Sequence, residues 1–172
     1  MASRRRNVVA DFWSSYLGRL RLKVGNDLVL MPGARTVMER ADGKILLERR
    51  ADFDIWGLPG GNAEDGEPIE QTMHRELQEE VGITALNLVP FGYSSQPDLE
   101  AFCYPNGHEM HSFCLNFHLT RWDGDPHVAD LDESLAIDWF DPAAPPDDLL
   151  PQHKRALKHF LVYQAGGGFQ LF

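Results

Sequence analysis

Residues 58–83 read LPGGNAEDGEPIEQTMHRELQEEVGI and join a glycine-rich opening to a strongly acidic end. Pro68 suits the first position of a helix, acidic residues crowd the turn that follows, and Gly82 is placed to stop the helix. Between them an apolar residue recurs every four positions, at 69, 73, 77 and 81. The stretch therefore predicts a loop followed by an amphipathic helix.

Three glutamates, Glu76, Glu79 and Glu80, stand close together at the end of this helix. At about 100° per residue they share one face, beside the apolar face that would pack on a sheet. Like charges this close repel one another unless something neutralises them. Carboxylate oxygens suit Mg²⁺, with Mn²⁺ as a possible substitute. A solvated acidic helix face is the alternative that these three residues alone leave open.

The charge and size of the chain limit its partners. Its 172 residues are 43% hydrophobic, which fits one domain with a real core. A net charge of -10 disfavours a nucleic-acid polymer, although a bound divalent cation could still bring a small anionic substrate to an acidic surface. No stretch approaches the roughly 18 consecutive apolar residues of a membrane span. We therefore expect a small anionic substrate, with no nucleic-acid polymer and no membrane as partner.

The two cysteines indicate a reduced protein. The Asn106-Gly107 pair predicts a two-residue hairpin loop, in whose register Cys103 faces Met110 and Cys114 lies too far away for a disulfide. A chain of this size with two unbonded cysteines is typical of the cytoplasm.

The N-terminal segment MASRRRNVVADFWSSYLGRLRL is rich in arginine and has one acid. An organellar presequence is one interpretation. The other is a helix over about residues 7–20, because apolar residues recur at helical spacing at positions 8, 9, 12, 13, 16 and 20. Such a stripe would pack on the domain or on a second subunit, which makes a homodimer possible. We divide the chain into a helical extension, 1–26, and a globular domain, 27–172.

The remaining pattern mixes strands and helices irregularly. A strand is expected over about 44–49, extended chain over 83–95, a strand over 135–140 and an amphipathic helix over 149–164. Residues 51–66 and 141–148 are expected to be loops. The fold class is α+β, or mixed α/β, with a central sheet and flanking helices.

The spacing of the quoted stretch resembles the signature box of the Nudix hydrolases. Every fixed position of this 23-residue pattern is filled, by Gly61, Glu67, Arg75, Glu76, Leu77, Glu79, Glu80, Gly82 and Ile83. The preceding WGLPGG and the earlier LLERR also resemble the family. The resemblance implies a Nudix fold, a mixed β-sheet sandwiched between α-helices, in which the loop and helix of the box supply a metal site.

The resemblance also implies roles for the residues of the box. Glu79 and Glu80 match the metal-binding pair, and Glu76 matches a further ligand. Arg75 and Glu67 match a supporting pair that would hold the helix face in register. All three acidic residues are therefore candidate catalytic and metal-binding groups.

Two glycines and one distant acid complete the candidate site. We place Gly60 at the metal. Gly61 is expected to bring the backbone close to the site and to adopt a positive φ, whereas a plain tight turn explains Gly60 equally well. Glu133 resembles the acid that several Nudix enzymes supply from a distant loop, as base or extra ligand. A solvated loop acid is the alternative.

The resemblance implies hydrolysis of a nucleoside diphosphate linked to another group, X, generally with Mg²⁺. Ser95-Gln96-Pro97 resembles the start of a motif of NADH pyrophosphatases, and Pro97 falls near a proline of ADP-ribose hydrolases. We therefore favour a nucleotide sugar such as ADP-ribose, or a dinucleotide, although a turn proline explains Pro97 as well.

Other functions remain open at this point. They are clean-up of nucleoside triphosphates and a non-catalytic nucleotide sensor, while RNA decapping is disfavoured by the net charge. The intact box favours an enzyme. Arg49 and Arg50 are candidate phosphate contacts, with salt bridges at the strand end as the commoner use.

Overall fold

The computed structural model describes residues 12–172. Its larger sheet has the strand order β11 (Gln170–Leu171), β6 (Val89–Ser94), β8 (Glu109–Leu119), β1 (Val29–Met38), β4 (Gly60–Asn62), and β7 (Ala101–Cys103) also pairs with β8. A smaller sheet has the order β10 (Ser134–Phe140), β2 (Ile45–Arg50), β3 (Trp56–Gly57), and β5 (Thr84–Ala85) pairs with β9 (Trp122–Asp123). Because β1 and β8 are parallel while β6 and β8 are antiparallel, the larger sheet is mixed.

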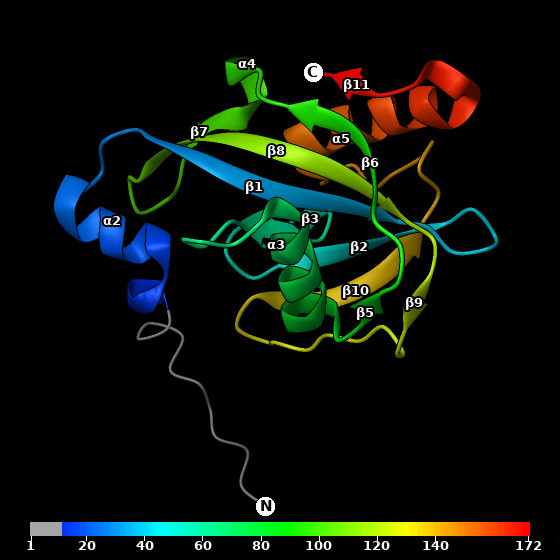
Figure 1. Ribbon diagram of the computed structural model, residues 1–172, viewed down its shortest axis with the longest axis horizontal. Helices are drawn as coiled ribbons and strands as arrows, with labels where there is room; N and C mark the ends of the chain where they lie inside the picture. Colours follow the sequence, from blue (N-terminus) through cyan, green and yellow to red (C-terminus); the bar gives the residue numbers. More distant parts are fainter. Residues whose placement is uncertain (1–11) are drawn as a thin grey trace, which may run out of the picture.

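Helices lie on both sides of these sheets (Figure 1). On one side α3 (Ile69–Glu76) continues into a π-helical turn, η1 (Leu77–Val81). On the other side α5 (Pro151–Val162) continues into η2 (Tyr163–Gly167). The helix α2 (Tyr16–Val24) lies at one end of the molecule, and α4 (Pro97–Glu100) is a single short turn.

The alternation of apolar side chains along the strands builds a core on each side. On β1, Met38 packs with Met73 and Leu77 beneath α3, whereas Val37 packs with Leu157 and Phe160 beneath α5. Successive side chains of a strand point to opposite faces, so one strand contributes to both cores. The expected mixed sheet between helices is confirmed.

The helix of the box matches the helix predicted from the sequence, except at its first residue and in its last turn. The expected apolar residues Met73, Leu77 and Val81 are buried, and Gly82 ends the helix in the left-handed conformation. Pro68 stands just before the first helical residue instead of occupying that position. The N–H of Gly82 donates to the carbonyl of Leu77, an i→i+5 bond that makes the last turn π-helical. Side chains in this turn therefore depart from ideal α-helical spacing.

The hairpin between β7 and β8 is wider than the sequence suggested. Cys103 pairs with Glu109, not Met110, because residues 104–108 form a longer turn closed by Tyr104 and His108. Both cysteines are free, Cys103 exposed and Cys114 buried, so the prediction that they are unbonded is confirmed.

The N-terminal helix differs from the expected one. Residues 12–14 are helical, the helix is interrupted at Ser15, and α2 begins at Tyr16, where the Ser15 hydroxyl caps it by accepting a bond from the Gly18 amide. Trp13 and Tyr16 of the expected stripe are 41% and 38% exposed, and the buried residues of α2 are Gly18 and Arg21. The expected start of the helix at residue 7 lies outside the described residues.

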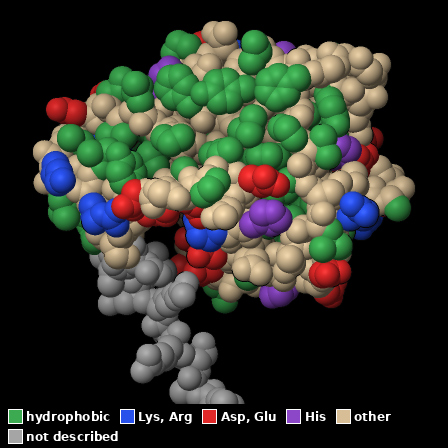
Figure 2. All heavy atoms as spheres, viewed as in Figure 1, with side chains coloured by type: hydrophobic (Ala, Val, Ile, Leu, Met, Phe, Trp, Pro, Cys, Tyr) green, Lys and Arg blue, Asp and Glu red, His purple; other side chains and the backbone are tan. Residues whose placement is uncertain are grey.

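Two surface features bear on partners. Between α2 and α3, acidic and basic side chains gather on the face shown in Figure 2, whereas apolar side chains cover much of its upper part.

Among residues 12–172, none of the helices has the length and apolarity that crossing a membrane requires.

Candidate active site

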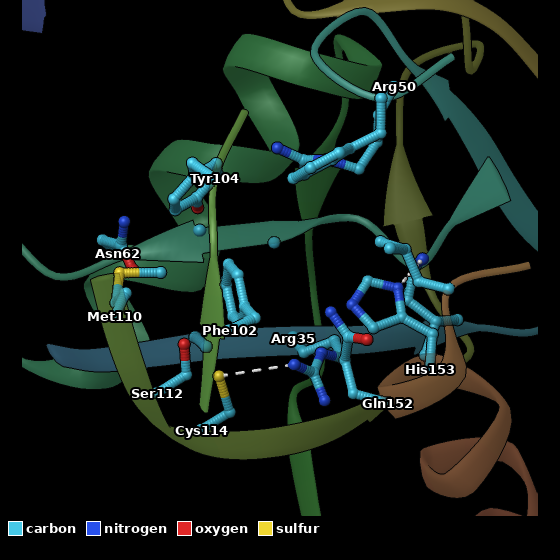
Figure 3. A pocket seen from close by; sticks show the side chains of 16 residues that line it. Arg35, Arg50, Asn62, Phe102, Tyr104, Met110, Ser112, Cys114, Gln152 and His153 are labelled. Carbon is cyan, nitrogen blue, oxygen red and sulfur yellow. Dashed lines mark hydrogen bonds between the residues drawn. The ribbon is translucent and has the colours of Figure 1, made fainter. Parts of the chain in front are cut away.

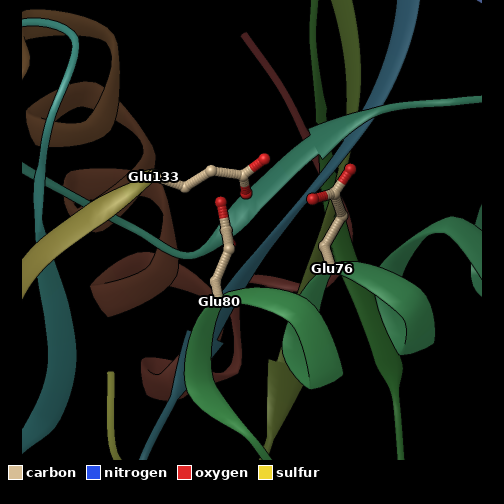
Figure 4. Close-up of side chains that lie close together, drawn as sticks. All are labelled: Glu76, Glu80 and Glu133. Atoms are coloured by element: carbon tan, nitrogen blue, oxygen red, sulfur yellow. The ribbon is translucent and has the colours of Figure 1, made fainter. Parts of the chain in front are cut away.

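Three carboxylates converge beside the box helix. One carboxylate oxygen from each of Glu76, Glu80 and Glu133 lies within 4.8 Å of the other two. Glu76 and Glu80 project from the helix, and Glu133 reaches toward them from the segment before β10 (Figure 4). Within residues 12–172 this is the group of His, Cys, Asp and Glu side chains whose spacing suits a metal ion.

The environment disfavours the charged form of all three acids. Burial raises the pKa of Glu76 to about 7, although Arg75 opposes the shift. Burial, followed by the neighbouring Glu48 and Glu76, raises the pKa of Glu80 well above its ordinary value. Burial and then Asp130 raise the pKa of Glu133. Crowded carboxylates with raised pKa values and oxygen ligands fit a divalent cation, whose charge would favour their ionised forms.

Glu79 lies at the edge of this group. Its side chain is 42% exposed and accepts a bond of 3.0 Å from Arg75 Nη1. An ideal α-helix would have grouped Glu79 with Glu76 and Glu80. In the structure Glu133 completes the closest group of acids instead, and metal binding by Glu79 stays a prediction.

Arg75 fixes the geometry behind the acids, with Glu67 as its main partner. Its Nε and Nη2 donate to the two oxygens of Glu67 at 3.0 and 3.2 Å, and Nη1 donates to Glu76 at 2.9 Å. Nη2 also donates to the carbonyl of Asn62 at 3.0 Å. Burial alone would raise the pKa of Glu67, but the bonds from Arg75, the Glu64 amide and Thr72 lower it. The expected pair is present and joins the loop to the helix.

Gly60 and Gly61, which stand side by side where the box begins, play different parts. Gly60 has a φ of 151°, and a Cβ there would overlap the carbonyl of Ala34. Its amide donates to Glu80 at 2.9 Å, and its placement at the metal stays a prediction. Gly61 has no positive φ, so the expectation for its backbone is wrong. A Cβ there would overlap the carboxylate of Glu76, so a larger residue would displace that side chain.

One buried acid beside the site, Glu48, is not among the residues predicted from the sequence. It is 1% exposed, accepts a 2.5 Å bond from the Ser134 hydroxyl and pairs with Arg50 at 3.4 Å. Burial raises the pKa of Glu48 to about 7. Glu48 has the same parity on β2 as Leu46, which packs beneath α3. In the sequence, an acidic residue two positions after a core leucine of the same strand was the feature that could have predicted a buried acid.

Only one of the two candidate arginines lies near the acids. Arg50 is bound to Asp52 through its Nε and Nη2, at 3.1 and 3.0 Å. Its side chain lines the space beside the acids. Arg49, the preceding residue of β2, points to the opposite face and pairs with Asp54 and Asp148, so the structure does not bring it to the site.

The acids border an open space that we call the catalytic cleft, of about 1680 Å³. It runs past Glu76, Glu80 and Glu133, between the N-terminal part of the described chain and residues 128–133. A smaller recess, the inner cavity of about 90 Å³, opens next to it. Both are lined by Arg50, Gly60, Gly61, Asn62 and Tyr104, so they meet beside the box loop.

Aromatic and polar side chains share the wall of the inner cavity (Figure 3). Phe53 stacks on Tyr104 with 5.6 Å between ring centroids, and Phe102 packs edge-on against Tyr104. Ser112, which is 6% exposed, adds a hydroxyl to this wall. Aromatic faces beside polar groups suit a flat polar ring.

Pro97, which favoured a nucleotide sugar or a dinucleotide, and Trp56, the first residue of WGLPGG, lie outside the cleft and the cavity. Pro97 begins α4 and lines neither the cleft nor the cavity. Trp56 packs edge-on against Phe140 and belongs to the core beneath α5.

The family model for the NUDIX domain matches residues 29–160. A putative 8-oxo-dGTP diphosphatase of Bacillus subtilis is 29% identical over 128 residues, covering 74% of this chain and 78% of that protein. A NAD-capped RNA hydrolase, NudC, of Pseudomonas aeruginosa is 31% identical over 77% of this chain. The chain matches only 43% of that protein's length.

Solved structures agree with the fold. A MutT NUDIX hydrolase from Burkholderia pseudomallei has a TM-score of 0.65 and 27% identity, covering 76% of this chain and 98% of its own. A UDP-X diphosphatase has a TM-score of 0.64 over 91% of this chain and 73% of its own, but at 18% identity it supports the fold alone.

Proposed function

Because the chain belongs to the Nudix hydrolase family, we propose that it is a Mg²⁺-dependent pyrophosphohydrolase that cleaves the diphosphate of a small nucleoside diphosphate derivative. The products would be a nucleoside monophosphate and a phosphorylated X. The observation that carries the proposal is the convergence of Glu76, Glu80 and Glu133 in the cleft, beside Gly60 and Gly61.

The chemistry of the site supports this reaction. Cleavage of a phosphoric anhydride requires neutralisation of phosphoryl charge, a positioned water and a base. A bound Mg²⁺ would supply the charge and polarise the phosphoryl group. Glu76 and Glu80 would hold the cation, and Arg75 keeps Glu76 in place. Glu133 is the most exposed of the three acids, and its raised pKa suits the acceptance of a proton from water.

The surroundings of the acids support a nucleotide as the substrate. Arg50 lies beside the site as a cation for phosphate oxygens, and the inner cavity offers a stacked aromatic wall for a base. We favour a nucleotide sugar or a dinucleotide, because the cleft extends well beyond the acids. The two free cysteines support a reducing compartment such as the cytoplasm.

Clean-up of nucleoside triphosphates is the second candidate. The relative of which this chain covers 78% is named a putative 8-oxo-dGTP diphosphatase. Relatives named for RNA ends match over shorter parts of their length, including an RNA pyrophosphohydrolase of Aliivibrio fischeri at 48%. Because relatives carry these names, the net charge alone does not exclude RNA as a substrate.

Hydrolysis assays with matched variants test the proposal. The purified protein is incubated with ADP-ribose, nucleotide sugars, dinucleoside polyphosphates and triphosphates, including 8-oxo-dGTP, with Mg²⁺, Mn²⁺ or EDTA. We expect nucleoside monophosphate release that requires the metal and is lost in Glu80→Gln. Glu70→Gln changes an exposed acid on the same helix and should leave turnover intact. Activity that survives Glu80→Gln, or tight nucleotide binding without any turnover, would contradict the proposal.

A further inference from the structure

The catalytic cleft has a wall that lies outside the matched family domain. Phe12, Ser14, Ser15, Leu17 and Arg21 line the cleft, and all of them precede residue 29, where the match begins. On the assumption that the proposed function is correct, we propose that α2 and the residues just before it bind X. They would select substrates in which X is a bulky polar group, a sugar phosphate or a second nucleotide.

The first support is that α2 is firmly attached to the catalytic domain. Arg21 is 3% exposed and donates to the carbonyls of Gly25, Asp27 and Glu109 at 3.1, 2.7 and 2.6 Å. Hydrogen bonds from a buried cation are among the stronger ones in proteins. Because Glu109 begins β8, these bonds join the end of α2 to the larger sheet.

The other end of α2 is joined to the box itself. The Tyr16 amide donates to Glu64 at 2.7 Å, and Arg19 pairs with Asp65 at 2.6 Å. Glu64 and Asp65 belong to the loop that connects β4 to α3. An exposed ion pair contributes little stability, but together these contacts set the position of the helix relative to the box.

The second support is the chemical character of this end of the cleft. Tyr104, Asn106 and His108 line the cleft with Arg21, and so does Glu64, whose carboxylate accepts the bond from the Tyr16 amide. The Nε of Arg21 is buried without a hydrogen-bond partner, which is uncommon for a cationic group. Burial and then Arg21 lower the pKa of His108, so a neutral imidazole and other polar groups lie beside the fixed positive charge of Arg21. Such a surface suits hydroxyl and phosphate groups.

The third support is size. Sites for drug-sized ligands commonly enclose about 300–1,000 Å³. The catalytic cleft of about 1680 Å³ is larger, and it is separate from the inner cavity proposed for the base. A triphosphate, whose X is only phosphate, would leave the α2 end of the cleft empty. A sugar phosphate or a second nucleotide would extend into it.

The test compares substrates that share one nucleoside and differ in X. ATP, ADP-ribose and diadenosine diphosphate are hydrolysed by the native protein and by Leu17→Ala, with the guanosine analogues run in parallel. Leu22→Ala is the matched control, because Leu22 lies on the same helix, is 71% exposed and does not line the cleft. We expect Leu17→Ala to raise the KM for the two substrates with bulky X about tenfold, with unchanged kcat and unchanged kinetics for ATP.

Control measurements separate the possible failures. Leu17→Met, which keeps the bulk of the side chain, should restore the KM, and melting curves show whether Leu17→Ala is folded. Equal effects on all substrates, no effect on any, or turnover of ATP alone by the native protein would overturn the role of α2 and leave the proposed hydrolase intact. If the native protein hydrolyses none of the substrates with Mg²⁺, the proposed function itself fails, and the role of α2 fails with it.

Discussion

Gly61 lies directly against the carboxylate of Glu76, so closely that a Cβ at position 61 would overlap both oxygens. Gly61 is on β4, which pairs with β1, and Glu76 ends α3. The sheet therefore sets one limit on where this carboxylate can lie, and the 2.9 Å bond from Arg75 sets another. A glycine in this place acts on the geometry of the site, not on the backbone conformation.

We expect Gly61→Ala to lose activity with little loss of stability. The backbone at Gly61 suits alanine, but the added methyl group would displace Glu76. A displacement of about 1 Å at a reacting centre can lower the rate about a hundredfold, and we expect a fall in kcat/KM of that order. Steady-state kinetics and thermal melting measure the two effects.

Gly43→Ala serves as the control, because we expect it to lose stability and keep its activity. Gly43 has a φ of 82° in a distant turn with open space around it. Alanine there should cost about 1 kcal/mol of folding free energy through backbone strain and leave kcat/KM unchanged. Native-like activity in Gly61→Ala would contradict the proposed contact.

Arg75→Lys should weaken metal binding although the charge is kept. Arg75 spans the two oxygens of Glu67 and also reaches Glu76, which a single ammonium group cannot do. Loss of such a supporting contact typically lowers metal affinity or activity about 10- to 100-fold. Mg²⁺ titration by calorimetry measures the affinity. Arg155→Lys, which changes a paired contact with the exposed Asp98, should leave Mg²⁺ binding unchanged.

Glu133→Gln separates a proton acceptor from a metal ligand. A lost general base lowers kcat about 10²- to 10⁴-fold with Mg²⁺ affinity retained, and that is the result we expect. A fall in both quantities would make Glu133 primarily a ligand. Asp132 also lines the cleft but is not in the converging group, so Asp132→Asn should stay close to native turnover. If Glu133→Gln turned over substrate at the native rate, Glu133 would be neither the base nor a metal ligand.

Local patterns predicted the box better than its surroundings. The four-residue recurrence of Met73, Leu77 and Val81 and the stop at Gly82 are short-range features, and the structure reproduces them. The π-helical turn was not foreseeable in this way, since it depends on packing. Ideal spacing consequently grouped Glu79 with the other acids, although its side chain lies at the edge.

Contacts between distant segments explain the rest of the differences. Glu133 reaches the acids because its carbonyl accepts a bond of 2.8 Å from the Ala51 amide, at the point where β10 begins to pair with β2. Nothing in the residues near 133 encodes that pairing. The same holds for the inner cavity, whose wall combines β1, β8 and α5, and for the attachment of Arg21 to Glu109.

His153 is a further long-range contact, and it predicts how stability depends on pH. It lies on α5, is 6% exposed, and its Nδ1 accepts a bond of 2.8 Å from the amide of Leu58, just before the box. The neutral ring must therefore carry its proton on Nε2. Burial, followed by the charges of Arg35 and Arg50, places the pKa of His153 well below its ordinary value.

The sign of the effect follows from proton binding. An unfolded histidine takes up a proton near pH 6.5, whereas the folded His153 does so only at lower pH. Its contribution to stability is therefore complete above about pH 6.5. Below that pH the contribution is lost, by up to about 1.4 kcal/mol per pH unit, until the pH passes the pKa of the folded state.

His153→Asn should remove this loss, because an asparagine oxygen can accept the bond from Leu58 but does not titrate. Chemical denaturation at pH 8, 7, 6 and 5 gives the free energy of unfolding of the native protein and the variant. We expect the native protein to lose its advantage over His153→Asn as the pH falls below about 6.5. His153→Leu should show the same reduced pH dependence. It should also be less stable than His153→Asn at pH 8, by about 1–3 kcal/mol, because the Leu58 amide loses its acceptor. Parallel curves for the native protein and His153→Asn would mean that His153 is not the neutral acceptor that holds Leu58 in place.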